Sequence, residues 1–184
     1  QVYRKWGPGS SCPPLSLLGP AQTLSRVRQI EGAAEPERYE CEFAFTQLRL
    51  GHAYEVGPLT VRPYRALHPV EAFGLRIEGP SEEEPSRTVA LFYTGDTDLC
   101  ESIIEGARGV DLLLSEVGFT SDETEPDMHM DGRRAGEVAR RAGVKRMLAT
   151  HIQPWTPRER VAAAIRQTWD GPLGFAAAGL QVSL

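Results

Sequence analysis

The sequence predicts an α/β protein in which helices cover a sheet. Short apolar runs that end in small turn residues are typical of buried strands. Three such runs lie at residues 88–93, 111–116 and 145–150. Helical patterns alternate with them, at residues 98–105, 131–142 and 157–169. This alternation of strands and helices, preceded by hairpin patterns, indicates one sheet with helices packed on it.

The N-terminal half is predicted to contain shorter elements. Gly, Pro and Ser residues between positions 6 and 14 indicate a loop. After it we expect a strand at 15–18, a helix at 21–30, a loop at 31–40, and a strand or short helix at 43–47. A β-hairpin at 53–56 and 59–67 then leads to His68, and the acidic, proline-containing stretch 78–87 is predicted to be a solvated turn.

Two of the predicted helices carry end signals. Asp131 is expected to be the N-cap of helix 131–142, and Gly143 is expected to end it. Thr156 is expected to cap helix 157–169, with Glu159 at the capping-box position. Because no linker or internal repeat interrupts these elements, residues 1–184 are predicted to form a single domain.

Composition excludes several classes of protein. A net charge of −5 argues against a broad nucleic-acid surface. The cysteines Cys12, Cys41 and Cys100 are odd in number and widely spaced, which supports neither a disulfide framework nor a Cys-x-x-Cys zinc site. No apolar run reaches the roughly 18 residues of a membrane span, and no signal-peptide pattern opens the sequence. We therefore expect a cytoplasmic protein that does not contact membranes.

Residues with potential chemistry stand where the predicted strands end. Asp96 follows strand 88–93, Glu116 ends strand 111–116, and His151 follows strand 145–150. Asp96 offers two hard oxygens, which lets one carboxylate bridge two cations about 3.5–4 Å apart. The alternative for Asp96 is an N-cap of the helix that begins near Asp98. Together the three residues suggest a metal or acid/base site along one edge of the sheet.

These motifs, with two more, resemble those of the metallo-β-lactamase superfamily. Within it they are similar to the phosphodiesterase branch, which includes ribonuclease Z and an atypical class of bacterial cyclic nucleotide phosphodiesterases. The motifs are Leu67-His68-Pro69, Tyr93-Thr94-Gly95-Asp96-Thr97, Leu112-Leu113-Leu114-Ser115-Glu116, Asp127-Met128-His129-Met130-Asp131 and Thr150-His151-Ile152-Gln153-Pro154-Trp155. The resemblance implies a metallo-β-lactamase-like αββα sandwich, of which this chain forms the C-terminal part.

The resemblance also implies a role for each site residue. His68 is expected to bind a first metal ion, His151 a second, and Asp96 to bridge the two. Zn²⁺ suits such His and carboxylate ligands best, and Mn²⁺ or Fe²⁺ is also admitted. Glu116 and His129 match the acid/base pair of the phosphodiesterases, in which the histidine protonates the leaving oxygen. The alternatives are a surface acid for Glu116, an exposed loop histidine for His129, and hydrogen-bonded histidines at strand ends for His68 and His151.

One departure from the superfamily pattern is large. The His-x-His-x-Asp-His signature does not occur in this chain, whose four histidines lie far apart in the sequence. We therefore expect the C-terminal part of a longer enzyme, or a homologue that has lost its first half. Each metal ion would then keep only two protein ligands, so weak metal binding and doubtful activity of the chain alone are expected. An uncovered sheet would favour a homodimer or strand exchange.

The expected function is metal-dependent hydrolysis of a small phosphodiester, such as a cyclic nucleotide, through attack by metal-bound hydroxide. Ribonuclease Z carries a long arm that grips transfer RNA between the segments that match His68 and Asp96. Here that interval holds only the acidic stretch 78–87, which is too short for an arm and has the wrong charge for phosphate. Structured RNA is therefore not expected as a substrate. The alternative function is a metal-free binding or assembly module that retains the fold.

Overall fold

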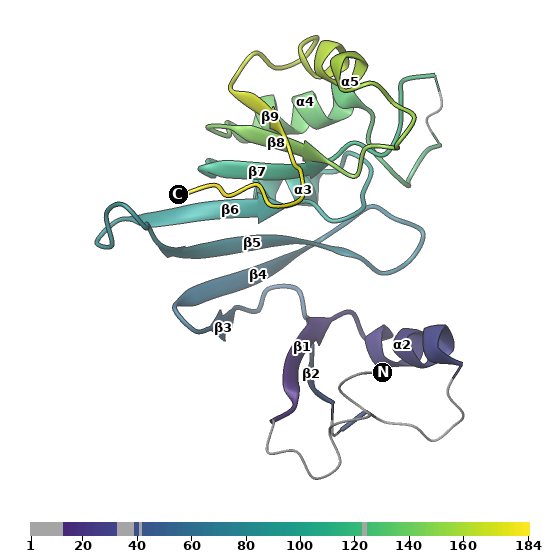
Figure 1. Ribbon diagram of the computed structural model, residues 1–184, viewed down its shortest axis with the longest axis vertical. Helices are drawn as coiled ribbons and strands as arrows, with labels where there is room; N and C mark the ends of the chain where they lie inside the picture. Colours follow the sequence, from purple (N-terminus) through teal and green to yellow (C-terminus); the bar gives the residue numbers. More distant parts are fainter. Residues whose placement is uncertain (1–12, 33–38, 41, 123–124) are drawn as a thin grey trace. The chain divides into compact units, whose positions relative to one another are not determined.

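The computed structural model describes residues 13–32, 39–40, 42–122 and 125–184 (Figure 1). The loops predicted at 6–14 and 31–40 therefore lie mostly outside the described residues. Contacts divide the chain into two compact units, residues 1–49 and 50–184, which are described separately below. The single domain over residues 1–184 stays a prediction.

The described part of the first unit is a small βαβ arrangement. Strand β1 (Leu15–Gly19), helix α2 (Thr23–Glu31) and strand β2 (Phe43–Gln47) follow one another along the chain. The two strands pair in parallel, with Leu15 opposite Phe43. Residues 43–47 are thus a strand rather than a short helix. Gly32 caps α2 with a φ of 65°, a left-handed conformation that glycine adopts without steric cost.

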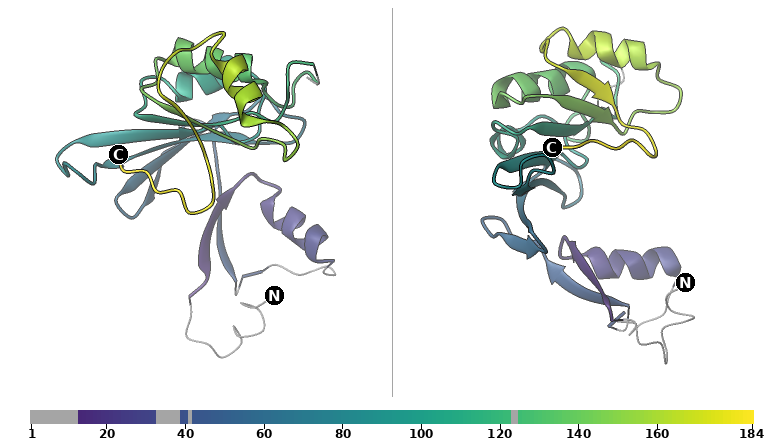
Figure 2. Two further views of the ribbon diagram at one scale, coloured as in Figure 1. Left: turned by 45° about the horizontal axis from the view of Figure 1, so that its top comes forward. Right: turned by 60° about the vertical axis from the view of Figure 1, so that its left-hand side comes forward.

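The second unit is built on a seven-stranded sheet in which spatial order equals chain order (Figure 2). Its strands are β3 (Tyr54–Val56), β4 (Leu59–Arg65), β5 (Phe73–Pro80), β6 (Thr88–Tyr93), β7 (Leu112–Glu116), β8 (Met147–Thr150) and β9 (Leu173–Phe175). Strands β3 to β6 are antiparallel to their neighbours, whereas β6 to β9 run parallel. Parallel neighbours need crossover connections, which helices provide here.

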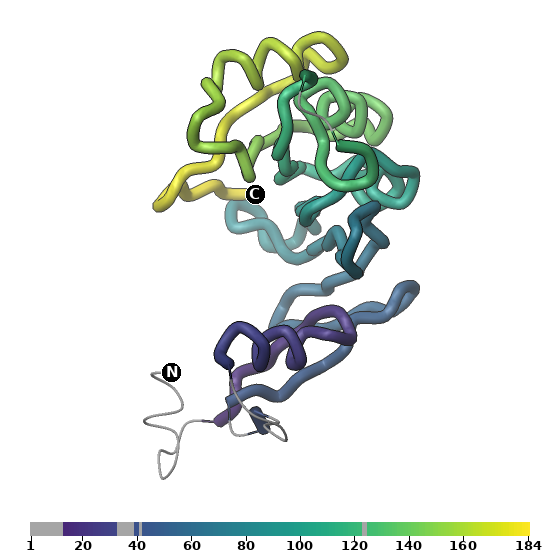
Figure 3. The backbone as a smooth tube through the Cα atoms, turned by 90° about the vertical axis from the view of Figure 1, so that its right-hand side faces the viewer, coloured from purple at the N-terminus to yellow at the C-terminus, as the bar shows by residue number. Residues whose placement is uncertain are grey.

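Three helices connect the parallel strands: α3 (Glu101–Gly106), α4 (Gly132–Ala142) and α5 (Arg158–Ile165). They lie on one side of the sheet in the backbone trace of Figure 3. Every second strand residue faces them, so Phe92, Leu113 and Met147 are buried in one cluster with the helix residues Ile103 and Val138. Parallel strands joined by helices that share this buried cluster confirm the predicted α/β class.

Helix α4 confirms its predicted end signals. The Asp131 side chain accepts a hydrogen bond from the Arg134 backbone N–H (2.9 Å), and Gly143 ends the helix with a φ of 65°. Helix α5 does not follow its prediction, because Pro157 occupies the N-cap position, where no side chain caps the helix. The capping role predicted for Thr156 is therefore wrong, and α5 ends at Ile165 rather than at residue 169.

Other element boundaries also differ from the predictions. Helix α3 begins at Glu101 instead of residue 98, because Asp98 pairs with Leu67 in an isolated β-bridge that keeps its backbone extended. Strand β5 continues to Pro80, into the stretch predicted as a turn, because residues 78–80 pair with β6. Strand β9 was not predicted. No helix among the described residues is long and apolar enough to span a membrane.

Candidate functional site

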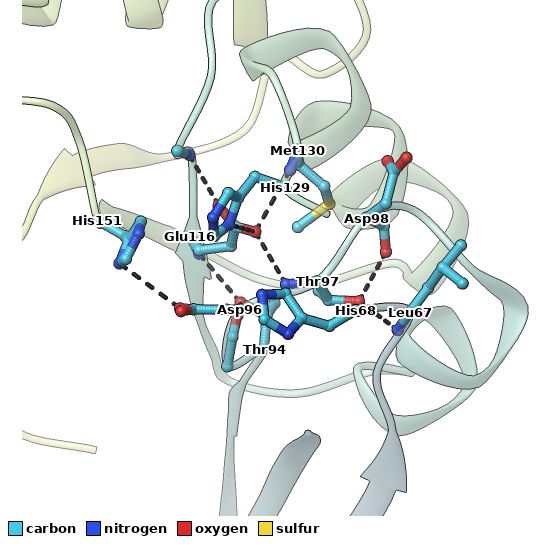
Figure 4. Close-up of polar contacts among 12 residues, drawn as sticks. Leu67, His68, Thr94, Asp96, Thr97, Asp98, Glu116, His129, Met130 and His151 are labelled. Atoms are coloured by element: carbon cyan, nitrogen blue, oxygen red, sulfur yellow. Dashed lines mark hydrogen bonds and ion pairs between the residues drawn. The ribbon is translucent and has the colours of Figure 1, made fainter. Parts of the chain in front are cut away.

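Strand direction brings the predicted site residues to one edge of the second unit. Strand β4 is antiparallel to β5, and β5 is antiparallel to β6, so β4 runs in the same direction as β6, β7 and β8. The segments that follow these strands therefore meet at the same edge. His68 follows β4, Asp96 follows β6, Glu116 ends β7 and His151 follows β8, and all four lie together in Figure 4.

Three side chains form a candidate metal centre at this edge. His68, Asp96 and His129 each offer one ligand atom, and these atoms lie within 4.8 Å of one another. His151 adjoins the group, because its Nδ1 lies 3.5 Å from Asp96 Oδ1. Two imidazoles and a carboxylate are ligands that suit Zn²⁺, Mn²⁺ or Fe²⁺. Catalytic zinc sites generally have three protein donors. His68 and Asp96 reach that number with either His129 or His151, which leaves the other of these two stacked histidines for proton transfer.

Glu116 is fully buried and holds His129 in place. Its Oε1 lies 3.0 Å from His129 Nδ1 and also accepts hydrogen bonds from the Thr97 and Met130 amides (2.9 and 3.3 Å). Its Oε2 accepts a hydrogen bond from the Gly118 amide (2.7 Å). Because Nδ1 is engaged by Glu116, Nε2 is the nitrogen of His129 that remains for a metal ion or a substrate.

Neighbouring rings restrict His129 further. Its ring stacks on His151, with centroids 5.0 Å apart, and the ring of Phe119 meets it edge-on at 5.0 Å. A Cβ atom at Gly118 would lie only 2.9 Å from His129 Cγ, so this position leaves room for glycine alone unless the ring shifts. The side chain of His129 is only 13% exposed. These contacts fix the ring before any ligand arrives.

The site is a region of negative charge. Burial raises the pKa of Glu116, although the hydrogen bonds from the Thr97 and Gly118 amides and the contact with His129 oppose this shift. Burial also raises the pKa of Tyr93, and the nearby Asp96 and Glu116 carboxylates add to the effect. Within the described part of the chain, no lysine or arginine forms an ion pair with Asp96 or Glu116. A bound cation would relieve this charge.

Two residues of the site region have backbone conformations with a positive φ. Gly95, directly before Asp96, has a φ of 62°, and a Cβ atom there would lie 2.7 Å from the Phe73 carbonyl oxygen. Only glycine fits this turn between β6 and Asp96. His151 itself has a φ of 55°, which is uncommon for a residue with a side chain. Such strained residues concentrate at functional sites.

The structure brings together all five residues singled out in the sequence. Glu116 is fully buried rather than a surface acid, and His129 is enclosed rather than an exposed loop histidine. Asp96 does not cap α3, because Cys100 occupies the N-cap position. His129 was predicted to be separate from the metal ligands, whereas one of its ring nitrogens lies within 4.8 Å of the ligand atoms of His68 and Asp96.

Two neighbours of Asp96 were missed in the sequence. The Thr97 hydroxyl accepts a hydrogen bond from the Leu67 amide (2.9 Å), and the Asp98 amide donates one to the Leu67 carbonyl (2.8 Å). These bonds hold the segment that carries His68 against the segment that carries Asp96. The only signal in the sequence is that both residues directly follow the Thr-Gly-Asp motif.

Comparisons with known proteins identify the family. The family model of the beta-lactamase superfamily domain matches residues 7–152. An uncharacterized protein of Mycobacterium tuberculosis is 38% identical over 175 residues, which cover 94% of this chain and 62% of that protein. A ribonuclease Z of Methanothermobacter thermautotrophicus is 35% identical over 130 residues, which cover 68% of this chain and 38% of that enzyme.

A solved structure agrees with these relatives. The crystal structure of the metallo-beta-lactamase fold protein YhfI from Bacillus subtilis matches with a TM-score of 0.74 at 21% identity, covering 91% of this chain and 64% of that protein. The chain therefore spans less than two thirds of the length of both the mycobacterial protein and YhfI. The match over residues 7–152, together with this fold, shows that the chain belongs to the metallo-β-lactamase superfamily.

Proposed function

We propose that this chain carries the metal-ligating and proton-transfer residues of a metal-dependent hydrolase, specifically a phosphodiesterase that acts on a small phosphodiester such as a cyclic nucleotide. The observation that carries the proposal is the pair formed by Glu116 and His129 beside His68, Asp96 and His151. A metal centre alone suits many hydrolytic reactions. A buried carboxylate that orients a histidine at its edge adds a proton donor for a poor leaving group.

The chain's residues divide the chemistry between them. His68, Asp96 and His151 would hold divalent metal, which when bound acts as a Lewis acid toward the phosphoryl oxygen and makes water more acidic. Glu116 holds Nδ1 of His129, so Nε2 faces the reacting group. As water adds to phosphorus and the P–O bond breaks, His129 Nε2 gives its proton to the leaving oxygen. The proton released by the attacking water later restores His129.

Asp96 is the residue best placed to be shared between two ions. Its Oδ1 approaches His151, and its ligand atom also belongs to the cluster with His68 and His129. A carboxylate between two sets of ligands matches the arrangement in two-metal hydrolases, where the ions lie about 3.5–4 Å apart. Two zinc ions are the proposed cofactors, with Mn²⁺ or Fe²⁺ as alternatives.

The connection between β5 and β6 supports a small substrate. Only residues 81–87 lie between these strands, and the Ser81 and Arg87 backbones are hydrogen-bonded to each other (2.8 Å). The turn contains Glu82, Glu83 and Glu84, which would repel a phosphate backbone. A ribonuclease Z is among the relatives of this chain, but this short acidic turn favours a cyclic nucleotide over structured RNA.

Leaving-group dependence tests the proposal. We would compare the wild type with His129→Ala and with His52→Ala, an exposed histidine outside the site, in the longest natural form of the protein that contains residues 1–184. The substrates are bis(p-nitrophenyl) phosphate, whose leaving group needs no proton, and cyclic AMP, whose ribose oxygen does. His129→Ala is expected to lower cyclic AMP hydrolysis about 10²- to 10⁴-fold and to affect the nitrophenyl ester much less.

Other results would change the assignment. An equal loss with both substrates would make His129 a metal ligand rather than the proton donor. Full activity of His129→Ala on cyclic AMP would exclude the proton-donor role. Cleavage of a transfer RNA precursor in preference to both small substrates would contradict the proposed substrate class. A wild-type protein that binds no metal and hydrolyses neither ester would favour the alternative of a metal-free binding module.

A further inference from the structure

Asp98 connects three segments of the candidate site, although it touches none of the proposed reacting groups. It is a charged residue with only 7% of its surface exposed. Its backbone pairs with Leu67 through the Asp98 N–H to Leu67 carbonyl bond (2.8 Å). The Thr97 hydroxyl strengthens this pairing, because it accepts a hydrogen bond from the Leu67 amide and donates one to the Asp98 carbonyl (2.7 Å). The segment of His68 is thereby joined to the segment of Asp96 (Figure 4).

The Asp98 carboxylate reaches the third segment, which carries His129. Its Oδ2 accepts a hydrogen bond from the Asp127 amide (3.1 Å), and Asp127 has a left-handed φ of 60°. Arg134 Nη1 lies 3.0 Å from both carboxylate oxygens. Arg134 thus balances the charge of Asp98, which would be costly to bury without a partner.

Arg134 also fixes the far end of the same segment. Its backbone N–H donates to the Asp131 side chain, which caps helix α4. The five residues from Asp127 to Asp131 are therefore held at both ends, by Asp98 at the first residue and by Arg134 at the last. His129 lies at the centre of this segment, and its neighbour Met130 donates its amide to Glu116.

We propose that Asp98 and Arg134 form a positioning pair, which sets the separation of His68, Asp96 and His129 without contacting metal or substrate. The proposal deepens the proposed function and rests on it for its relevance to catalysis. The hydrogen bonds and the ion pair that define this pair lie within the chain and need no metal. Groups behind metal ligands that orient them are worth about 10- to 100-fold in metal affinity or activity.

Helix α4 supplies a matched control. Arg141 lies seven residues after Arg134, so the two side chains are on the same face of the helix. Arg141 pairs with Glu101 of α3 (2.6 Å) and with Glu137 of its own helix (3.7 Å), and neither partner belongs to the segment from Asp127 to Asp131. Arg134→Ala and Arg141→Ala therefore remove the same charge and its ion pairs from one helix, and only the first loosens the segment of His129.

The first measurement is zinc affinity by titration calorimetry, with the absorption spectrum of the Co²⁺-substituted protein as a second readout. Arg134→Ala is expected to weaken zinc binding about 10-fold or more and to change the Co²⁺ spectrum, whereas Arg141→Ala stays within about twofold of the wild type. Arg134→Lys retains the charge but not the fork of the guanidinium, so partial recovery is expected. Equal weakening by Arg134→Ala and Arg141→Ala would overturn the proposal, as would wild-type affinity of Arg134→Ala.

A second measurement needs neither metal nor activity. Amide hydrogen exchange in the metal-free protein should become faster at Asp127 and Met130 in Arg134→Ala and stay unchanged there in Arg141→Ala. Unchanged exchange at both amides in Arg134→Ala would overturn the positioning role even if the protein bound no zinc. Faster exchange together with an absence of hydrolysis in the wild type would instead contradict the proposed function and leave the positioning pair intact.

Discussion

Acidic side chains at the two edges of the parallel half of the sheet have different ionic partners. At the carboxyl edge, Asp96 and Glu116 have histidines as their ionic partners among the described residues. At the amino edge, Asp111 precedes β7 and meets two full cations, Arg87 Nη2 at 2.6 Å and Lys145 Nζ at 2.7 Å. It also accepts the Ala90 amide (2.9 Å). Asp111 is thus balanced by lysine and arginine, as Asp98 at the carboxyl edge is balanced by Arg134, whereas Asp96 and Glu116 have no such cation among the described residues.

The pKa values of the two acids follow this difference. Burial opposes the ionisation of Asp111, but the hydrogen bonds from Lys145 and Ala90 and the charges of Lys145 and Arg87 outweigh it, so the pKa lies below its usual range. Burial of Glu116 is the larger effect at the other edge, and its pKa is raised. The difference teaches that paired cations favour the ionised form of an acid at the amino edge, whereas at the carboxyl edge burial makes ionisation of Glu116 costly until a cation or a protonated histidine lies beside it.

The largest expected effect concerns metal binding. Asp96→Asn should lower zinc affinity by more than about 100-fold, because it removes the charged member of the cluster with His68 and His129. Asp111→Asn at the amino edge should leave the affinity unchanged. Titration calorimetry on both variants measures the contrast, with circular dichroism as a control for folding. Equal losses in the two variants would erase the distinction between the edges, and a wild-type protein without zinc affinity would contradict the metal centre.

The second effect concerns stability. Glu116→Ala leaves the amides of Thr97, Gly118 and Met130 without their acceptor inside the protein, and each such loss costs about 1–3 kcal/mol. We expect the free energy of unfolding to fall by roughly 3 kcal/mol or more, measured by urea denaturation without metal. Lys145→Ala removes an ion pair whose lysine is 62% exposed, and it should cost at most about 1 kcal/mol. Similar losses in free energy of unfolding for the two variants would show that the buried hydrogen bonds of Glu116 stabilise the protein no more than the exposed ion pair of Lys145 does.

The smallest effect is the pH dependence of stability. The pKa of Glu116 is raised in the folded protein, so stability should decrease as the pH rises from 4.5, the ordinary pKa of a glutamate, through the raised value. The pKa of Asp111 is lowered, so its contribution is present above 3.8, the ordinary pKa of an aspartate, and is lost as the pH falls below it. Urea denaturation between about pH 3 and pH 8, again without metal, measures both slopes.

Two isosteric variants would show which residue causes each slope of stability against pH. Glu116→Gln should remove the decrease at the higher pH, and Asp111→Asn should remove the loss at the lower pH. If Glu116→Gln keeps the wild-type slope above pH 4.5, another group causes it and the pKa of Glu116 is not raised by burial.

Local signals in the sequence predicted much of the fold. Helix α4 has its predicted caps, because Asp131 and Gly143 act within one turn of the helix. Helix α3 starts later than predicted, because the long-range pairing of Asp98 with Leu67 overrides the helical pattern. Strand β9 has only three residues, too few for a periodic pattern, and its pairing with β8 defines it.

The sequence by itself determined which residue types stand after which strands, and therefore that Asp96, Glu116 and His151 share one edge of the sheet. His68 joins them because β4 pairs antiparallel with β5. Periodicity and turn residues are local, so they can be recognised in a single sequence. Only the tertiary structure decided that Glu116 is buried, that His129 lies beside His68 and Asp96, and that Asp98 and Arg134 connect the segments. Those properties depend on distances between segments far apart in the chain, which are set by strand register and helix packing.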